Sequence, residues 1–272
     1  MKPVAFDYER PHTIEGAVGI LSGNSDAKIL AGGQTLGPML NLRLVQPTLI
    51  VDVTRIPDLT RIEEEEDAVT LGACITHAAI EDSRFADPSN GFLAEVARGI
   101  AYRAVRTRGT IGGSLAHADP AADWLSCLLA VGAEVLLTGP RGKRRVALKE
   151  FVRGALDTEL APDEVLDGVR IPRFSRKARA GFAKICRKSG EFADAIGAVV
   201  HDSDRGVLQL VAGATRGQPI LINGEAEGLG ASFPPPLEPV REKLKQSGLV
   251  GDAYELNIHM AAIKRAIANA QA

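Results

Sequence analysis

The chain has 272 residues, 45% of them hydrophobic, so we expect one or two domains with a buried core. A formal net charge of −2 at pH 7 gives no reason to expect nucleic acid or an anionic membrane as a partner. No stretch approaches the roughly 18 consecutive apolar residues of a membrane span. Residues 1–16 also lack the apolar core of a signal peptide. We therefore expect a soluble, cytoplasmic protein.

The three cysteines, Cys74, Cys127 and Cys186, are far apart in the sequence and form no C-x-x-C pair. Three thiols cannot supply the four thiolates of an iron–sulfur cluster, and their spacing matches no zinc motif. We expect free thiols in a reducing compartment and no metal site in this chain. The acidic run 63–67 is expected to be a solvated hairpin tip, because ligands on one exposed turn diverge.

Apolar patterning in the first half predicts alternating helices and strands. Apolar residues at helical spacing between Thr13, an expected N-cap, and Gly23 predict a short amphipathic helix. A second short helix is expected to start at Pro38, and Thr76 is expected to cap a helix near 77–82. Strands are predicted in 27–33, in 47–53 and on both sides of the acidic turn within 59–73.

The second half carries further signals of both kinds. Residues 91–105 have the apolar spacing of a helix, and Asp119 with Pro120 suits the N-cap and first position of another. A Gly-Pro-Arg-Gly turn predicts a hairpin over 133–148, and the basic segment 173–180 is the candidate domain boundary. Further strands are expected in 164–172, 181–188, 195–202 and 206–214, and helices in 234–248 and 254–270.

Two segments, 29–36 and 110–114, each contain a Gly-Gly pair close to a threonine or serine. Consecutive glycines allow a positive φ and a close approach of the backbone to a ligand, and successive N–H groups form a concave nest for a phosphate oxygen. A strand followed by Gly-Gly is also the pattern of a plain turn. The residues alone therefore leave two interpretations open, a tight turn or a phosphate or dinucleotide site.

Several other motifs are absent from the sequence. The glycine spacing is not the GxGxxG of a Rossmann site, and there is no GK[ST] of a P-loop, no G-x-S-x-G elbow and no HExxH. No cluster of a general base with a nucleophile is visible. We therefore expect no catalytic residues of its own in this chain.

Two long stretches, AGGQTLGPMLNLRLVQPTLIVDVTRI (31–56) and VRTRGTIGGSLAHADPAAD (105–123), occur in this order and resemble the FAD-binding medium subunit of molybdenum hydroxylases. That family includes the medium subunits of carbon monoxide dehydrogenase and quinoline oxidoreductase and the flavin domain of xanthine dehydrogenase. The similarity covers residues 1–200 well and the remaining tail more loosely.

The resemblance implies an α+β fold. Residues 1–174 would form a PCMH-type FAD-binding domain, like that of vanillyl-alcohol oxidase, in two α/β subdomains. The smaller subdomain would span 1–56 and the larger one 57–174, with FAD held between them. Residues 175–272 would form a C-terminal domain made of a three-stranded antiparallel sheet with helices.

The resemblance also implies which residues hold the cofactor. The first glycine segment would wrap the FAD pyrophosphate, and the second would lie on its other side and against the flavin. Ile100 would pack on the cofactor, and Asp123 would accept hydrogen bonds from its hydroxyls. Leu166 and Lys184 would contact the isoalloxazine, where a lysine would stabilise reduced flavin. The implied set is Ile29, Leu30, Ala31, Gly32, Gly33, Gln34, Thr35, Leu36, Ile100, Thr110, Ile111, Gly112, Gly113, Ser114, Asp123, Leu166 and Lys184.

Some of these positions have plainer interpretations. Asp123 is alternatively a first-turn helix carboxylate, and Lys184 an exposed strand lysine. His77 and His117 raise the question of a covalently tethered flavin, but we expect His117 to be structural or a hydrogen-bond donor near the cofactor. Trp124 replaces the aliphatic residue usual in relatives, and we expect it in the core rather than at the cofactor edge.

The function implied is electron transfer within a heterotrimer, with FAD as the cofactor of this chain. A large subunit would carry the molybdopterin cofactor and hydroxylate the substrate. A small subunit with two [2Fe-2S] clusters would pass electrons to the FAD, which would deliver them to an external acceptor. A dimer of such heterotrimers is expected. Two alternatives stay open, a self-contained FAD oxidase of the same fold and a flavin-free assembly module.

Overall fold

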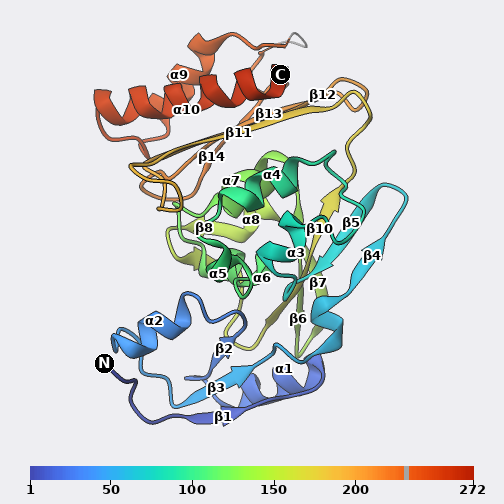
Figure 1. Ribbon diagram of the computed structural model, residues 1–272, viewed down its shortest axis with the longest axis vertical. Coiled ribbons are helices and arrows are strands. Elements are labelled where there is room, and N and C mark those ends of the chain that lie inside the picture. Colours follow the sequence, from blue (N-terminus) through green and yellow to red (C-terminus); the bar gives the residue numbers. More distant parts are fainter. Residues whose placement is uncertain (230–232) are drawn as a thin grey trace.

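The computed structural model describes residues 1–229 and 233–272, and its three main β-sheets are stacked along the long axis of the molecule (Figure 1). The sheet at the N-terminal end is parallel, with the order β1 (Asp7–Glu9), β3 (Leu49–Asp52) and β2 (Lys28–Leu30). The predicted first helix is α1 (Ile14–Gly23), and Thr13 caps it by accepting from the Gly16 N–H at 3.0 Å. A short helix, α2 (Leu36–Asn41), follows the first glycine segment.

The middle layer is an antiparallel sheet with the order β4 (Ile62–Glu64), β5 (Ala68–Gly72), β10 (Val165–Pro172), β6 (Glu134–Gly139) and β7 (Gly142–Ala147). It confirms both predicted hairpins. Short helices surround it: a 3-10 turn (Pro57–Thr60), α3 (His77–Glu81), α4 (Phe92–Gly99), α5 (Arg103–Arg106), α6 (Ile111–His117), α7 (Asp123–Ala130) and α8 (Leu148–Phe151). A two-stranded sheet of β8 (Val152–Gly154) and β9 (Asp157–Thr158) completes the layer.

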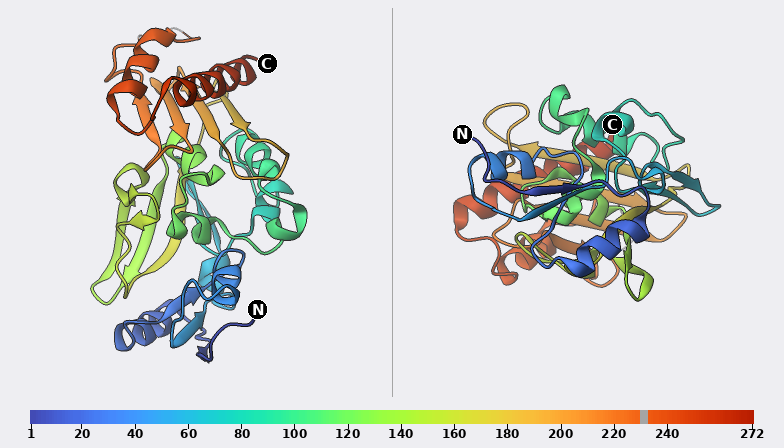
Figure 2. Two further views of the ribbon diagram at one scale, coloured as in Figure 1. Left: turned by 90° about the vertical axis from the view of Figure 1, so that its left-hand side faces the viewer. Right: turned by 90° about the horizontal axis from the view of Figure 1, so that it is seen from below.

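The C-terminal layer is an antiparallel sheet with the order β11 (Arg179–Ile185), β12 (Ala195–Asp202), β13 (Val207–Gly213) and β14 (Ile220–Asn223). The first three strands are those predicted from the sequence, and β14 adds a fourth strand at the edge. Helix α10 (Ala253–Gln271) covers the outer face of the sheet, with α9 (Leu237–Gln246) beside it, and α7 packs on the inner face (Figures 1 and 2).

This sheet is buried on both faces, and alternate residues of β12 therefore enter different cores. Ala198 and Val200 pack into the large core that contains α7, whereas Val199 packs with the residues of α10. Helix α10 lies unusually close to the sheet at Gly197, where a Cβ atom would lie 2.4 Å from the carbonyl carbon of Ala262. A glycine is therefore required at this position by the packing of the helix.

Two local predictions from the sequence are wrong. The helical pattern over 91–105 is divided into α4 and α5 by a turn at residues 100–102, where Ala101 has a φ of +42°. Helix α7 starts at Asp123 with Ala122 as N-cap, and Pro120 lies before it. The Asp119 carboxylate instead accepts from the Ala121 N–H at 2.9 Å, which forms an Asx turn ahead of the helix.

Within the described ranges, no helix combines the length and apolar composition needed to cross a membrane. The same residues contain no group of three or more histidine, cysteine or acidic side chains placed to hold a metal ion. The three cysteines are free thiols, and two of them, Cys74 and Cys127, are buried.

Candidate functional site

A cleft of about 660 Å³ is lined by residues from all three layers. The strand β2 and the first glycine segment form one wall, and α6, α7 and the start of β10 form another. Residues 184 and 190–192 of the C-terminal layer close one end. Of the residues implied by the resemblance, all line this cleft except Leu30 and Ile111. Ile111 is fully buried beneath it, and the Leu30 side chain packs beside Gly33.

The first glycine segment is an open turn between β2 and α2. Gly33 has a φ of +70°, a conformation that favours glycine. At Gly32 there is no room for a side chain, because a Cβ there would lie 2.1 Å from the carbonyl oxygen of Arg108. The backbone N–H groups from Gly32 to Thr35 donate to no acceptor in the described part of the chain. These successive free donors are available to an anionic group, which is one of the two interpretations that the sequence leaves open.

The second glycine segment does not form the predicted open loop with free N–H groups, because it is helical. Residues 111–114 are the first turn of α6, and Thr110 is its N-cap. All four N–H groups of this turn are already bonded, so the segment offers no backbone nest. The N–H groups of Ile111 and Gly112 donate to the carbonyls of Ile75 and Ala73, respectively. Those of Gly113 and Ser114 donate to the hydroxyl and the carbonyl of Thr110, respectively.

The glycines of this second segment serve close packing instead. A Cβ at Gly112 would lie 2.7 Å from the carbonyl oxygen of Ala73, and a Cβ at Gly113 would lie 2.8 Å from the Thr110 hydroxyl oxygen. Without side chains, the start of α6 can lie directly under the cleft. Among the cleft-lining residues of this segment, Ser114 offers a side-chain hydroxyl that bonds to no described residue.

Asp123 and Lys184 form an ion pair in the cleft between α7 and β11. The Lys184 Nζ atom lies 2.9 Å from Asp123 Oδ1, and the two side chains are 11% and 8% exposed. The same amine donates to the carbonyl of Gly99 at 2.9 Å. Burial raises the pKa of Asp123, and the positive charge of Lys184 opposes that shift. The lysine is therefore a fixed, buried charge and not the exposed strand lysine of the plainer interpretation.

Residues 4–174 match the protein family described as the FAD-binding domain in molybdopterin dehydrogenase. The chain belongs to this family. It is thus part of an oxidoreductase, and the resemblance noted in the sequence is confirmed.

The relatives of this FAD-binding chain include subunits of bacterial oxidoreductases. The nicotine 6-hydroxylase medium subunit of Paenarthrobacter nicotinovorans is 36% identical over 96% of this chain and 92% of that subunit. Subunit alpha of the 6-hydroxypseudooxynicotine dehydrogenase complex of the same organism is 39% identical over 71% of this chain, and the match spans only 66% of that subunit. A solved structure of carbon monoxide dehydrogenase from Hydrogenophaga pseudoflava aligns with a TM-score of 0.88 at 34% identity, over 100% of this chain and 99% of that chain.

The cleft of this FAD-binding chain has the donor set that FAD requires. A pyrophosphate needs several N–H or O–H donors, and the free backbone groups of the first segment supply them. Hydroxyl groups of the cofactor need acceptors, and Asp123 supplies a buried carboxylate. The volume is in the usual range for a pocket that encloses a large organic ligand. The residues present therefore fit the group.

His77 and Trp124 form a hydrogen-bonded pair on the floor of the cleft. The Trp124 indole N–H donates to His77 Nδ1 at 2.9 Å, and the side chains are nearly fully buried, Trp124 being 1% exposed. This placement agrees with a core position for Trp124. Burial, with a smaller contribution from the charge of Arg106, lowers the pKa of His77 to about 4. His77 is therefore neutral at pH 7, with its proton on Nε2 because Nδ1 accepts from the indole.

Sequence reasoning missed other residues that line the cleft. Ala101, Glu191 and Phe192 line the cleft together with Lys184. Residues 158, 160–162, 164 and 165 line it as well. Ala101 carries no signal, because an alanine inside an apolar helical pattern suggests only helix. Phe192 could have been noticed as an aromatic residue in an otherwise polar loop, and it is 69% exposed.

We predict that His77 makes the stability of the protein depend on pH. The imidazole is protonated near pH 6.5 in the unfolded chain and only near pH 4 in the folded chain. The unfolded state therefore binds more protons between these values, and the free energy of unfolding decreases as the pH falls through this window. The expected loss between pH 7 and pH 5 is about 2 kcal/mol.

Urea unfolding of the wild type and of His77→Asn at both pH values measures this effect. The asparagine keeps an acceptor for the indole N–H of Trp124 but does not titrate. The wild type should lose about 2 kcal/mol more than the variant on going to pH 5. Equal losses in the two proteins would show that His77 is not buried in its neutral form.

Proposed function

We propose that this chain is the FAD-carrying electron-transfer subunit of a heterotrimeric molybdenum hydroxylase. It accepts electrons from [2Fe-2S] clusters of a partner subunit and passes them to an external acceptor. The observation that carries the proposal is one cleft, in a chain of this family, that combines a run of free backbone N–H groups with a buried lysine–carboxylate pair.

In this proposal the first glycine segment holds the pyrophosphate through its free N–H groups, and the hydroxyls of Thr35 and Ser114 add donors from either side. Asp123 accepts hydrogen bonds from cofactor hydroxyls. Ile100 and Leu166, which both line the cleft, supply apolar contacts. The backbone of the second segment supports the cleft from below, and of its residues Ser114 supplies the hydrogen-bonding group.

When bound, the flavin supplies the redox chemistry that no amino-acid side chain provides. Lys184 places a positive charge at the end of the cleft, where it favours the reduced, more negative form of a neighbouring group. Asp123 keeps this ammonium buried, because an unpaired charge there would be costly. The neutral His77 adds no charge of its own beneath the cleft.

The metal cofactors belong to partner subunits in this proposal. Three separate thiols cannot ligate a [2Fe-2S] cluster, and several relatives are named as medium chains or medium subunits. We infer a large subunit with the molybdopterin cofactor, a small subunit with two [2Fe-2S] clusters and a dimer of heterotrimers in the cytoplasm.

We also propose the domain division 1–174 and 175–272, with subdomains 1–56 and 57–174. The last strand of the middle sheet ends at Pro172, and the first strand of the C-terminal sheet starts at Arg179. The smaller subdomain corresponds to the parallel N-terminal sheet with α1 and α2.

Purification of the tagged chain from its native host tests the proposal. A molybdenum-containing large subunit and a ferredoxin-like small subunit should co-purify and be identified by mass spectrometry. Heating the complex in acid should release FAD into the supernatant, whereas a self-contained oxidase with tethered flavin would retain it in the pellet. A flavin-free preparation without these partners would support the assembly-module alternative.

We predict that Gly33→Ala removes most of the bound FAD while the protein stays folded. An alanine at φ +70° is strained by about 1 kcal/mol, and its Cβ would lie 3.2 Å from Leu30 Cδ1, so the nest must change shape. Gly37→Ala is the matched control, because a Cβ there meets no atom within 4 Å. The ratio of flavin to protein absorbance measures the effect. Full flavin content in Gly33→Ala would place the pyrophosphate elsewhere.

We predict that the double variant Lys184→Met/Asp123→Asn lowers the reduction potential of the bound flavin. It removes both members of the ion pair, of which Lys184 is the one that we place against the isoalloxazine, and it leaves no unpaired carboxylate. A decrease of at least about 30 mV is expected, which corresponds to about 1.4 kcal/mol for a two-electron couple. Potentials are measured by equilibration with redox dyes. Lys188→Met, at an exposed site four residues along the same segment, should leave the potential unchanged.

A further inference from the structure

The turn at residues 100–102 forms the wall of the cleft next to Lys184. It separates α4 from α5, and the side chains of Ile100 and Ala101 line the cleft. Ala101 has a φ of +42°, a left-handed conformation that non-glycine residues rarely adopt. No local sequence feature, such as a glycine or an asparagine, favours this conformation. Contacts with the rest of the protein must therefore impose it.

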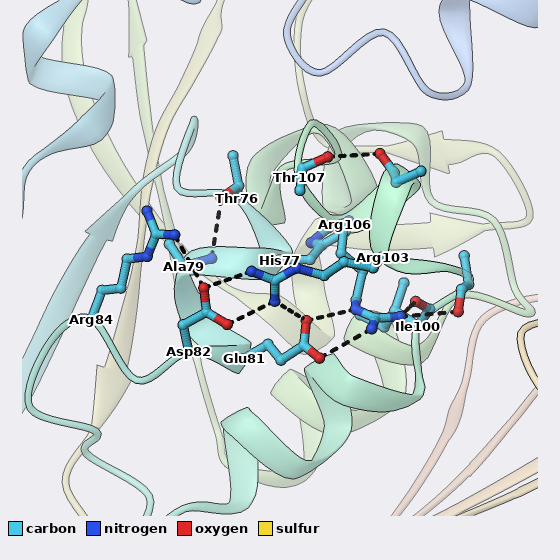
Figure 3. A network of polar contacts seen from close by, with 12 residues as sticks. Thr76, His77, Ala79, Glu81, Asp82, Arg84, Ile100, Arg103, Arg106 and Thr107 are labelled. Atoms are coloured by element: carbon cyan, nitrogen blue, oxygen red, sulfur yellow. Dashed lines mark hydrogen bonds and ion pairs between the residues drawn. The ribbon is translucent and has the colours of Figure 1, made fainter.

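Arg106 makes these contacts from within α5 (Figure 3). Its Nη1 atom donates to the carbonyl oxygens of Ile100 at 2.8 Å and Ala101 at 3.0 Å. Its Nε and Nη2 atoms donate to the two carboxylate oxygens of Glu81 at 2.7 and 3.0 Å. The guanidinium side chain is only 10% exposed. Glu81 therefore fixes one edge of the guanidinium group. The other edge, at Nη1, holds the carbonyl groups of two consecutive residues, which both point toward it.

The C-terminal layer contacts the same turn from the opposite side. Lys184 donates to the carbonyl of Gly99, directly before the turn. Gly190 lies so close that a Cβ there would be 3.1 Å from the ring of Tyr102 and 3.2 Å from the carbonyl oxygen of Ala101. The turn is therefore in direct contact with the Lys184 amine and with the loop of residues 190–192.

We propose that Arg106 is a positioning residue for the flavin site. By holding the carbonyls of Ile100 and Ala101, it keeps the turn left-handed, which presents Ile100 to the cofactor and the Gly99 carbonyl to Lys184. It acts through these residues and does not itself line the cleft. This inference rests on the proposed function only where it concerns the flavin, because the fixed turn is a property of the chain itself.

Arg103 offers a matched comparison within the same network (Figure 3). It donates to Glu81 at 2.6 Å and to both oxygens of Asp82 at 2.7 Å, but it makes no hydrogen bond to the turn. The Arg106 side chain is 10% exposed and that of Arg103 45%, so a role in packing α3 against α5 would give Arg106 the larger effect on stability. Such a role alone would not change the spectrum of bound flavin or be reversed by a glycine at residue 101. If Arg106 positions the turn, its substitution alone should change the flavin site.

The test compares Arg106→Lys with Arg103→Lys in the full chain. A lysine keeps the positive charge beside Glu81, but it lacks the planar fork that bridges a carboxylate and two carbonyl groups. Arg106→Lys should increase the FAD dissociation constant at least tenfold and change the visible circular dichroism of the remaining bound flavin. Arg103→Lys should change the dissociation constant less than twofold.

The substitution Ala101→Gly then separates positioning from general stability. Glycine adopts a positive φ without strain, so the double variant Arg106→Lys/Ala101→Gly should recover most of the lost affinity. Loss of affinity without recovery would mean that Arg106 acts through general stability, and that outcome overturns the proposal. Unchanged affinity and circular dichroism in Arg106→Lys would also overturn it.

Amide hydrogen exchange on the flavin-free chain provides a readout that does not depend on the proposed function. Peptides that cover residues 98–103 should exchange at least tenfold faster in Arg106→Lys than in Arg103→Lys. A wild-type chain that binds no FAD would refute the proposed function, and the turn would then be judged on exchange alone. Equal exchange in the two variants would refute the role of Arg106.

Discussion

The cleft depends on the direct approach of one main chain to another at Gly32. Its missing Cβ would lie 2.1 Å from the carbonyl oxygen of Arg108, so the end of β2 touches the segment that leads into α6 with no side chain between them. Gly112 makes a similar contact with the backbone of Ala73. A larger residue at Gly32 would separate the N-terminal part from the middle layer, and a larger residue at Gly112 would separate α6 from the segment that follows β5. Near Gly32 the wall of the cleft is consequently made of backbone, and the donors that line it there are main-chain N–H groups.

The two glycine pairs look alike in the sequence but differ in their hydrogen bonds. Around Gly33 the N–H groups have no acceptor in the described residues, because the chain turns sharply between a strand and a helix. Around Gly113 every N–H is bonded, because Thr110 caps α6 and the carbonyls of Ala73 and Ile75 accept from the first two N–H groups of the helix. In the proposed function, backbone recognition of the pyrophosphate therefore falls to the first segment, and the hydrogen-bonded start of α6 supports the cleft.

The sequence predicted most elements correctly because apolar periodicity and turn residues are local signals. The resemblance predicted the family and brought together residues far apart in the chain. Neither could predict the break at Ala101, since its left-handed conformation is imposed by Arg106 and by distant Glu81. The bonded N–H groups of residues 111 and 112 escaped prediction for the same reason, since their acceptors lie some 36 to 39 residues earlier, at Ile75 and Ala73. Asp123 and Lys184 were both named, but not their ion pair.

That ion pair links the position of the C-terminal sheet to the charge of the cleft. Helix α7 carries Asp123 and, three residues later on the same face, Ser126. A Cβ at Gly213 would lie 1.8 Å from the Ser126 hydroxyl oxygen, so β13 lies directly on this helix. The contact that docks the sheet and the carboxylate that holds Lys184 thus belong to one rigid element. A shift of the sheet along α7 would move Lys184 away from Asp123, so the electrostatics of the site depend on correct docking of the C-terminal layer.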